Sequence, residues 1–252
     1  MCFYDKVPII KKLDKGDLPN ITMSLLDLFE EYDVKVTFFV LGVICEWYPE
    51  LLREILKREH EVAFHGYSHN KSRSRHLIDE LSRSEKFIRK YKMDGFRAPE
   101  MSISKQDLDS LKSFDFKYDS SIYGSNHTIL YNEIIEVPVS TYPVQLPQEK
   151  LLPKPFMNSI RHGSIPIGSG AFLGLLQSKT LDALIRKINK KKHPFIAFIH
   201  PWQFTNFPKK MIKFNDLYKL PYWITISKNK IKNLLSKHSF VSMKTILKEI
   251  RD

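Results

Sequence analysis

Two histidines four residues apart give the first indication of chemistry in this chain. His65 and His69 follow directly after the apolar run 61–64, which has the length and composition of a short strand. Neutral imidazoles are common ligands of divalent metals, above all zinc. If residue 64 ends a strand of an α/β barrel, both rings lie where barrels of this kind carry their chemistry. The pair therefore predicts a metal site.

Further polar residues occupy equivalent places along the chain. Arg97, Asp119 and His200 each lie at or just after the end of a strand-like run. Because the carboxyl ends of barrel strands meet at one end of the barrel, we expect these side chains to gather near His65. Their spacing predicts one site rather than scattered surface residues.

The elements that must position these residues alternate between helical and strand patterns. Helices are predicted at 21–32, 49–60, 77–91, 104–114, 178–190, 230–236 and 244–250, and strands at 34–41, 61–64, 95–98, 117–121, 133–139, 195–199 and 240–243. Ser104 and Asp107 fit a capping box at the start of their helix. The Pro- and Gly-rich segment 141–174 is interpreted as a long functional loop region on the barrel face. This alternation predicts a parallel sheet closed, or nearly closed, into a barrel.

Size and composition limit the classes of protein. A chain of 252 residues with 42% hydrophobic content can bury one large core, so a single domain over 1–252 is expected. The 40 basic residues exceed the 28 acidic ones, a formal charge of +12 that suits an anionic partner or simply solubility. No Gly-rich phosphate loop, RNA-binding aromatic strand or zinc-finger spacing accompanies this charge, so no nucleic-acid partner is expected.

Compartment signals are few. Cys2 and Cys45 do not make a disulfide framework. The sequence contains no apolar signal core and no run near the ~18 apolar residues of a spanning helix. We therefore expect a cytoplasmic protein without a transmembrane segment.

Five short motifs in order carry a family resemblance. They are 36–42 (VTFFVLG), 65–69 (HGYSH), 96–99 (FRAP), 118–121 (YDSS) and 198–202 (FIHPW). The chain thereby resembles the polysaccharide deacetylase family, also called the NodB-homology family. The RAP, DSS and HPW forms are similar to the branch found among microbial polysaccharide-biosynthesis proteins, in which a Gly-rich segment like 168–172 recurs.

The resemblance implies a fold and an activity. Its members adopt a distorted (β/α)7 barrel and remove acetyl groups from N-acetylated sugars by metal-assisted hydrolysis. They hold zinc or another divalent ion with one Asp and two His, so His65 and His69 would be the two His ligands. By ligand type, cobalt, nickel and iron suit such a site as well as zinc. The expected partner is an N-acetylated amino sugar or polysaccharide.

The resemblance also implies roles for the later motifs. His200 would protonate the leaving amine, and Arg97 would orient the carboxylate base. Pro99, Asp119 and Trp202 would line the sugar pocket. From the residues alone, Asp119 fits an ordinary strand end with turn-forming hydroxyls equally well.

The N-terminal acid of the family is the main departure. Family members begin with a strand that ends in an acidic cluster, and this cluster supplies the catalytic base and the Asp ligand. Here 1–4 is interpreted as a truncated first strand with Asp5 at its end, although Asp5 is single and Lys6 follows it. Alternatively, the chain starts after the missing strand.

Three functions follow from this departure. The first is an active carbohydrate deacetylase that uses Asp5 as both base and metal ligand. The second is a catalytically impaired or truncated deacetylase fold, such as a carbohydrate-binding pseudoenzyme. The third is a hydrolase of another non-peptide carbon–nitrogen amide bond. Metal content and amine release separate the first two.

Overall fold

The computed structural model describes residues 14, 16–69, 76–124, 129–131, 133–143, 160, 163–191, 193–204 and 224–251. The helices are α2 (Asp17–Glu31), α3 (Gly42–Trp47), α4 (Pro49–Lys57), α5 (Leu77–Tyr91), α6 (Lys105–Ser113), α8 (Gly170–Leu175), α9 (Ser178–Asn189), α10 (Lys228–Leu235) and α11 (Met243–Arg251), with short 3-10 turns η2 (Pro99–Met101) and η3 (Pro201–Phe204). The strands are β1 (Thr37–Val40), β2 (Glu61–Phe64), β3 (Gly95–Phe96), β4 (Tyr118–Asp119), β5 (Tyr123–Gly124), β6 (Ile129–Tyr131), β7 (Ile134–Glu136) and β8 (Val139–Ser140).

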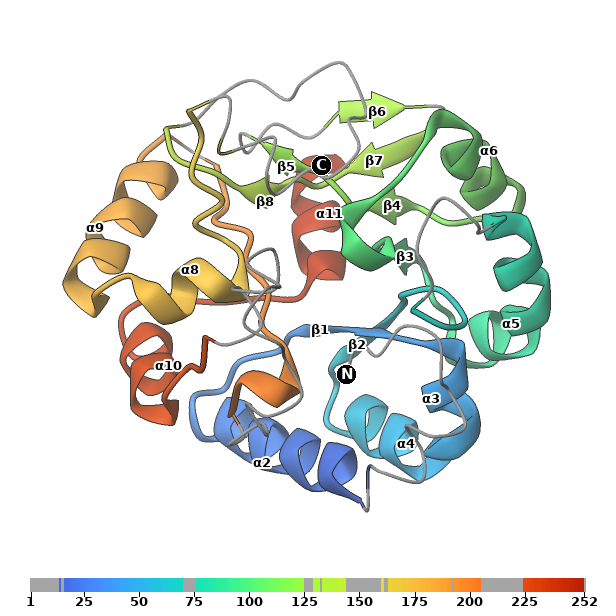
Figure 1. Ribbon diagram of the computed structural model, residues 1–252, viewed down its shortest axis with the longest axis horizontal. Helices are drawn as coiled ribbons and strands as arrows, with labels where there is room; N and C mark the ends of the chain where they lie inside the picture. The colour runs from blue at the N-terminus through green and yellow to red at the C-terminus, as the bar shows by residue number, and fades with distance from the viewer. Residues whose placement is uncertain are drawn as a thin grey trace, which may run out of the picture.

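The strands form a curved sheet in the order β1-β2-β3-β4-β7-β6, and β5 pairs with β8 in a second, smaller sheet. The first five strands run parallel, whereas β6 joins β7 antiparallel. Most helices surround the strands as a ring, whereas α11 lies near the centre of the view (Figure 1). Parallel strands joined through outer helices are the architecture of an α/β barrel, so the predicted distorted barrel is confirmed.

The two faces of the sheet pack against different partners. Phe39, Tyr118 and Ile135 lie on one face and pack with the apolar residues of α11. Phe64 and Phe96 lie on the other face, in a cluster with the apolar residues of α5 and α6. Because side chains alternate along a strand, each residue that follows Phe64 or Phe96 points back toward the first face. We call this first face the interior and the second face the outer layer.

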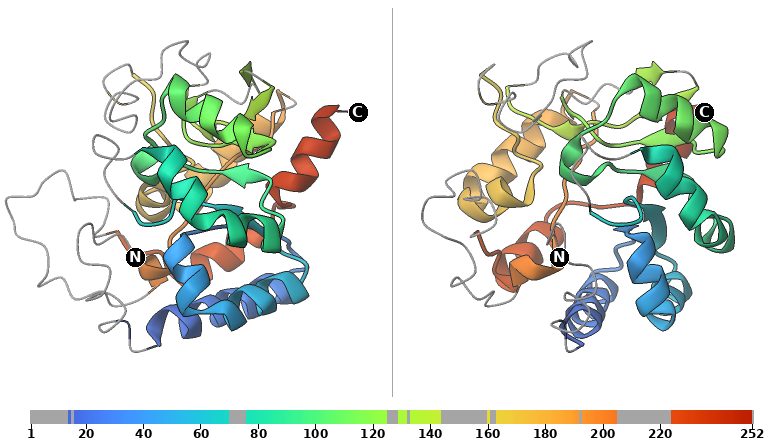
Figure 2. Two further views of the ribbon diagram at one scale, coloured as in Figure 1. Left: turned by 90° about the vertical axis from the view of Figure 1, so that its right-hand side faces the viewer. Right: turned by 45° about the vertical axis from the view of Figure 1, so that its right-hand side comes forward.

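A glutamate at the start of β2 attaches α11 to the amino ends of the strands. Glu61 accepts hydrogen bonds from Tyr118 Oη (2.9 Å), from Thr37 Oγ1 (2.6 Å) and from the backbone N–H of Lys244 (2.9 Å). Thr37 Oγ1 in turn accepts from the N–H of Met243 (2.8 Å). These bonds satisfy the first N–H groups of α11, which would otherwise lack partners. The helix lies to one side of the strands (Figure 2), which leaves their carboxyl ends for the site.

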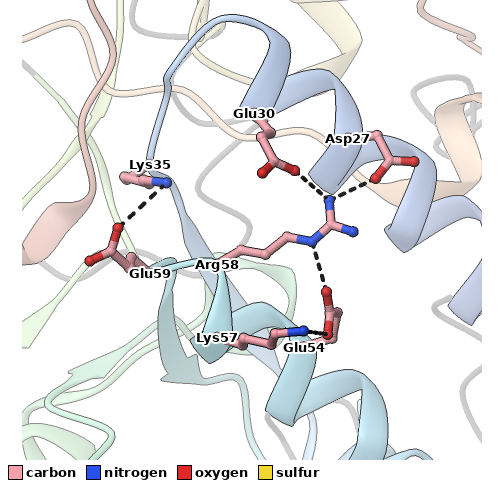
Figure 3. A network of polar contacts seen from close by, with 7 residues as sticks. All are labelled: Asp27, Glu30, Lys35, Glu54, Lys57, Arg58 and Glu59. Atoms are coloured by element: carbon pink, nitrogen blue, oxygen red, sulfur yellow. Dashed lines mark hydrogen bonds and ion pairs between the residues drawn. The ribbon is translucent and has the colours of Figure 1, made fainter.

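An arginine joins α2 to α4 on the outside of the barrel (Figure 3). Arg58 follows α4 and donates from Nη1 to Asp27 (2.7 Å) and Glu30 (3.0 Å) of α2. Its Nε donates to Glu54 on its own helix (2.9 Å). The two acids of α2 are largely exposed, so solvent screens their pairs with Arg58 and each contributes little stability on its own.

Several sequence expectations need correction. The segment 195–199 is extended but forms no regular strand; instead Ile196 O accepts from Ser140 N (3.0 Å) and Phe198 N donates to Gly168 O (2.9 Å). The predicted strand at 240–243 is wrong, because 240–242 are irregular and Met243 begins α11. The loop region 141–174 ends in α8, and the sequence did not predict α3, β5 or β6. Asp5 and the first strand expected at 1–4 lie outside the described residues.

Other expectations are confirmed. Strand β2 and helix α5 have the predicted bounds, and α2, α4, α6, α9, α10 and α11 agree to within four residues at each end. Ser104 Oγ accepts from Asp107 N (3.1 Å) and Asp107 accepts from Ser104 N (2.8 Å), which is the predicted capping box. No helix among the described residues is long and apolar enough to cross a membrane.

A buried histidine makes the stability of this fold dependent on pH. His60 Nδ1 accepts from Val36 N (3.1 Å), and burial, followed by the charge of Lys35, lowers the pKa of His60 to about 4. Below about pH 6.5 the unfolded chain gains a proton here that the folded chain does not. Stability is therefore fully present above the unfolded pKa and is lost as the pH falls from there toward the folded pKa.

We expect His60 to make the free energy of unfolding about 2 kcal/mol lower at about pH 5 than at about pH 7. In the variant His60→Asn, the side-chain oxygen can still accept from Val36, but the residue no longer titrates. Urea denaturation at both pH values should show a shallower pH dependence in the variant. An equal dependence in both proteins would contradict this assignment.

Candidate functional site

The two histidines of the first motif lie side by side at the carboxyl end of β2. Their ring centroids are 5.3 Å apart, and the rings are inclined at 69°. His65 Nδ1 lies 2.6 Å from the backbone oxygen of Arg97, and since a carbonyl only accepts, this nitrogen carries the proton. Burial and the charge of His69 lower the pKa of His65 well below its usual value. His65 is therefore neutral, with the lone pair on Nε2.

The loop between the histidines is tied to α3 and α5. Gly66 O and Tyr67 O accept from the first N–H groups of α3, those of Gly42 (2.9 Å) and Val43 (3.0 Å). Tyr67 N donates to the buried carboxylate of Glu80 on α5 (3.3 Å). Gly66 has φ +85°, and a Cβ atom there would lie 2.7 Å from Glu80 Oε2. Glycine therefore permits the turn that brings His69 next to His65.

Arg97 follows β3 and lies in the interior. Its Nε donates to Ser120 O (2.8 Å) and its Nη2 to Ser120 Oγ (2.7 Å). The guanidinium lies 4.3 Å from the ring centroid of Phe39 and 5.3 Å from that of Phe198. Burial lowers the pKa of Arg97 to about 10, which leaves it charged at neutral pH. The site therefore contains one fixed cation held over two aromatic faces.

His200 enters the site from the extended segment before η3. Its ring stacks on Trp202, with centroids 5.0 Å apart and planes inclined at 20°. Its backbone N–H donates to Gln203 Oε1 (2.9 Å), while Gln203 N donates to His200 O (3.0 Å). Burial lowers the pKa of His200 to about 3, and the charge of His69 contributes. His69 and His200 therefore interact electrostatically.

The remaining predicted residues lie in different places. Pro99 begins η2, and its Cγ would lie 3.4 Å from a Cβ at Gly66, so it packs beside the histidine loop. Asp119 is fully buried in the outer layer and accepts from Ser121 Oγ (2.5 Å) and Ser121 N (3.1 Å). Its assignment to the sugar pocket stays a prediction, as do the roles of Asp5.

Sequence reasoning missed three residues that support the site. Glu80 binds the histidine loop, Gln203 binds the backbone of His200, and Glu136 contacts Asp119. Gln203 directly follows the FIHPW motif, and Glu136 is an acid inside an otherwise apolar strand run. Gln203 therefore lay outside every predicted element, and Glu136 lay within the strand predicted at 133–139.

The donor set fits part of a metal site. A metal-binding His commonly donates its other ring N–H to a carbonyl or carboxylate, and His65 makes this bond with Arg97 O. Among the residues with a described position, no group of three or more His, Cys, Asp or Glu side chains comes together as a metal site. The described part therefore offers two imidazoles.

Family models match nearly the whole chain. Residues 4–118 match the model described as polysaccharide deacetylase, and residues 120–248 match the domain of unknown function DUF3473. The second match covers half of the chain, so the chain belongs to the DUF3473 family. The polysaccharide deacetylase match precedes it in the same chain.

Curated relatives are similar over shorter stretches. A peptidoglycan-N-acetylglucosamine deacetylase of Bacillus cereus is 33% identical over 66 residues, which cover 26% of this chain and 24% of that protein. A peptidoglycan deacetylase of Helicobacter pylori is 31% identical over 113 residues, 42% of this chain and 39% of that protein. The matched stretch thus spans less than half of the length of either relative.

Solved structures share the fold. A Mycobacterium smegmatis protein assigned to the polysaccharide deacetylases superposes with a TM-score of 0.60 at 18% identity, covering 98% of this chain and 86% of that one. A CE4 family pseudoenzyme from Bacillus anthracis gives a TM-score of 0.50 at 14% identity, covering 91% and 61%. At these identities the comparisons show the barrel fold alone.

The hydrogen bonds of Gln203 should contribute measurably to the free energy of unfolding. The substitution Gln203→Leu removes the acceptor for His200 N and the donor to Ile224 O (3.3 Å). Because Gln203 is buried, we expect a loss of about 1–3 kcal/mol in the free energy of unfolding for each group left unpaired. Denaturant titration should show this loss, whereas Gln106→Leu on the exposed face of α6 should change little. Equal effects of the two substitutions would show that the bonds to Gln203 contribute nothing.

Proposed function

We propose that this chain is a metal-dependent deacetylase that removes acetyl groups from an N-acetylated amino sugar or polysaccharide. The single observation that carries the proposal is the bond from His65 Nδ1 to Arg97 O (2.6 Å). It leaves the lone pair of a neutral imidazole on Nε2, the form of histidine that metal sites use. The deacetylase family match and the activities named for the curated relatives support the same reaction class.

His65 and His69 would hold the cation, and Asp5 would be the third ligand and the base. The donor set of two imidazoles and one carboxylate suits zinc, with cobalt, nickel and iron as alternatives. When bound, such a cation polarises the amide carbonyl and promotes attack by water. Asp5 would take the proton that water releases as its oxygen bonds to the carbonyl carbon.

Arg97 would orient the carboxylate base, and His200 would donate a proton to the leaving nitrogen. The guanidinium, held by Ser120, would orient the carboxylate base through charged hydrogen bonds. His200 is neutral because burial lowers its pKa to about 3, so it would first take up the proton that Asp5 has received from water and then donate it to the leaving nitrogen. The carbon–nitrogen bond then breaks, acetate leaves, and the sugar keeps a free amine.

A second candidate function rests on the incomplete ligand set. Within the described ranges the two imidazoles have no third ligand, which favours a carbohydrate-binding pseudoenzyme if Asp5 does not complete the site. Such a protein would bind glycan through Pro99 and Trp202 without releasing amine. Metal content and amine release decide between the two candidates.

Metal content is the first test. We expect about one divalent ion per purified chain after zinc supplementation, and its loss in His65→Ala and in His69→Ala, since each variant removes a ligand. The matched control is His76→Ala, because His76 is exposed at the start of α5. Elemental analysis measures the ion. Equal metal content in all four proteins would contradict the assignment of the pair.

Amine release tests the role of Asp5. We expect the wild-type chain to release amine from an N-acetylated chitooligosaccharide and Asp5→Asn to lower the rate about 10²–10⁴-fold, since the variant loses general-base help. The matched control Asp17→Asn changes an exposed acid in the first turn of α2 and should retain the rate. Bound metal without amine release in the wild type would favour the pseudoenzyme.

A further inference from the structure

Two buried acids lie next to each other behind the candidate site. Asp119 ends β4 and Glu136 ends β7, and the parallel register pairs them directly. Asp119 is 0% exposed and Glu136 is 6% exposed. Register also aligns Asp119 with Phe96 and Phe96 with Phe64, so the two acids continue this row in the outer layer.

The register places the two carboxyl groups side by side, and Glu136 Oε1 is buried with no hydrogen-bond partner among the described residues. An ionised carboxylate only accepts, so a hydrogen bond between the two groups needs one proton. Burial raises the pKa of both groups, and the charge of Asp119 raises the pKa of Glu136 well above its usual value. Glu136 therefore carries the proton, and Asp119 is the ionised partner.

The net charge of the Asp119–Glu136 pair is set against the positive charge of Arg97. Arg97, which follows β3, is the cation that acts on Asp119 and Glu136, and Tyr123 on β5 is a further titratable group near that guanidinium. Helix α6 turns Leu108 and Leu111 toward the sheet. One shared proton leaves one negative charge opposite the positive charge of Arg97. Two ionised acids would place an uncompensated charge in the core, which is costly.

The acid pair is connected to Arg97 through two serines. Ser121 Oγ donates to Asp119 (2.5 Å) and accepts from Ala98 N (2.7 Å), so it links β4 to the residue after Arg97. Ser120 accepts both described hydrogen bonds of the guanidinium. The position of this short segment therefore sets the position of Arg97.

We propose that Glu136 is a positioning residue: as a neutral acid it donates a hydrogen bond to Asp119 and so holds Ser120 and Ser121 where they orient Arg97. This inference rests on the proposed function, in which Arg97 orients the base. Glu136 itself touches neither substrate nor metal. Its task is to hold a buried carboxylate in place at neutral pH, without adding a second negative charge.

Infrared spectroscopy tests the shared proton without reference to activity. We expect wild-type protein at neutral pH to show the carbonyl stretching band of a protonated carboxyl group, and we expect Glu136→Gln to lose it. The matched control Glu133→Gln changes an exposed acid just before the same strand and should retain the band. Absence of the band in the wild type, or its persistence in Glu136→Gln, would overturn the proposal.

Two substitutions separate positioning from space filling. Gln can donate an N–H to Asp119, whereas Leu fills similar space without a donor. We expect Glu136→Leu to lower kcat for amine release about 10- to 100-fold with KM unchanged, because the base is misplaced, and Glu136→Gln to retain most of kcat. Equal activity of the two variants would show that Glu136 only fills space.

Hydrogen exchange measured by nuclear magnetic resonance tests the role of Glu136 even if the protein turns over no substrate. The Nε–H signal of Arg97, identified by its loss in Arg97→Lys, should exchange slowly with solvent in the wild type and in Glu136→Gln. It should exchange quickly in Glu136→Leu. If wild-type protein releases no amine, the proposed reaction fails, but the infrared and exchange results still decide the role of Glu136. Should Glu136→Leu not fold, the infrared comparison decides it alone.

Discussion

The parallel register of β2, β3 and β4 is the constraint on which the site depends. Residues that follow Phe64, Phe96 and Asp119 must point to the same face, because these three strand ends are aligned side by side. His65, Arg97 and Ser120 are those residues. The bonds from His65 Nδ1 to Arg97 O and from Arg97 to Ser120 connect the three strands in order. A shift of one residue in any strand would turn its polar group into the outer layer.

Burial then decides the charge of each group in the site. The imidazoles of His65 and His200 are neutral because the barrel interior disfavours a second and third positive charge beside Arg97. Neutral imidazole is the form that binds metal. The same desolvation forces Asp119 and Glu136 to keep one proton. Four titratable groups and one arginine thus reach a definite charge state through their positions on the strands.

Periodicity and motif order predicted much of this arrangement. The run 61–64 was short, apolar and bounded by polar residues, and it forms β2 with those bounds. The His pair, Arg97 and His200 were predicted to meet. His65 lies beside His69 and against the backbone oxygen of Arg97, and the roles of all four residues stay predictions. Each of these predictions depends on local sequence, because strand length and the residue at a strand end are local properties.

Contacts between distant segments could not be predicted from local sequence patterns. The run 195–199 has the sequence of a buried strand. Its backbone, however, forms hydrogen bonds with Ser140 through Ile196 and with Gly168 through Phe198, and no regular ladder forms. The partnership of Asp119 with Glu136 depends on β7 pairing next to β4, which no periodicity reveals. Likewise, Gln203 was readable as a polar residue but not as the acceptor for His200 N, since that bond depends on the turn η3.

The central claim is that His65 and His69 bind one metal ion together at the carboxyl end of β2. A crystal structure of the zinc-soaked protein, with anomalous difference density at the zinc edge, tests it most directly. The account predicts one strong peak at about 2.0–2.1 Å from Nε2 of His65 and at the same distance from a ring nitrogen of His69. Full zinc occupancy elsewhere on the chain, with no peak between these two rings, would contradict it.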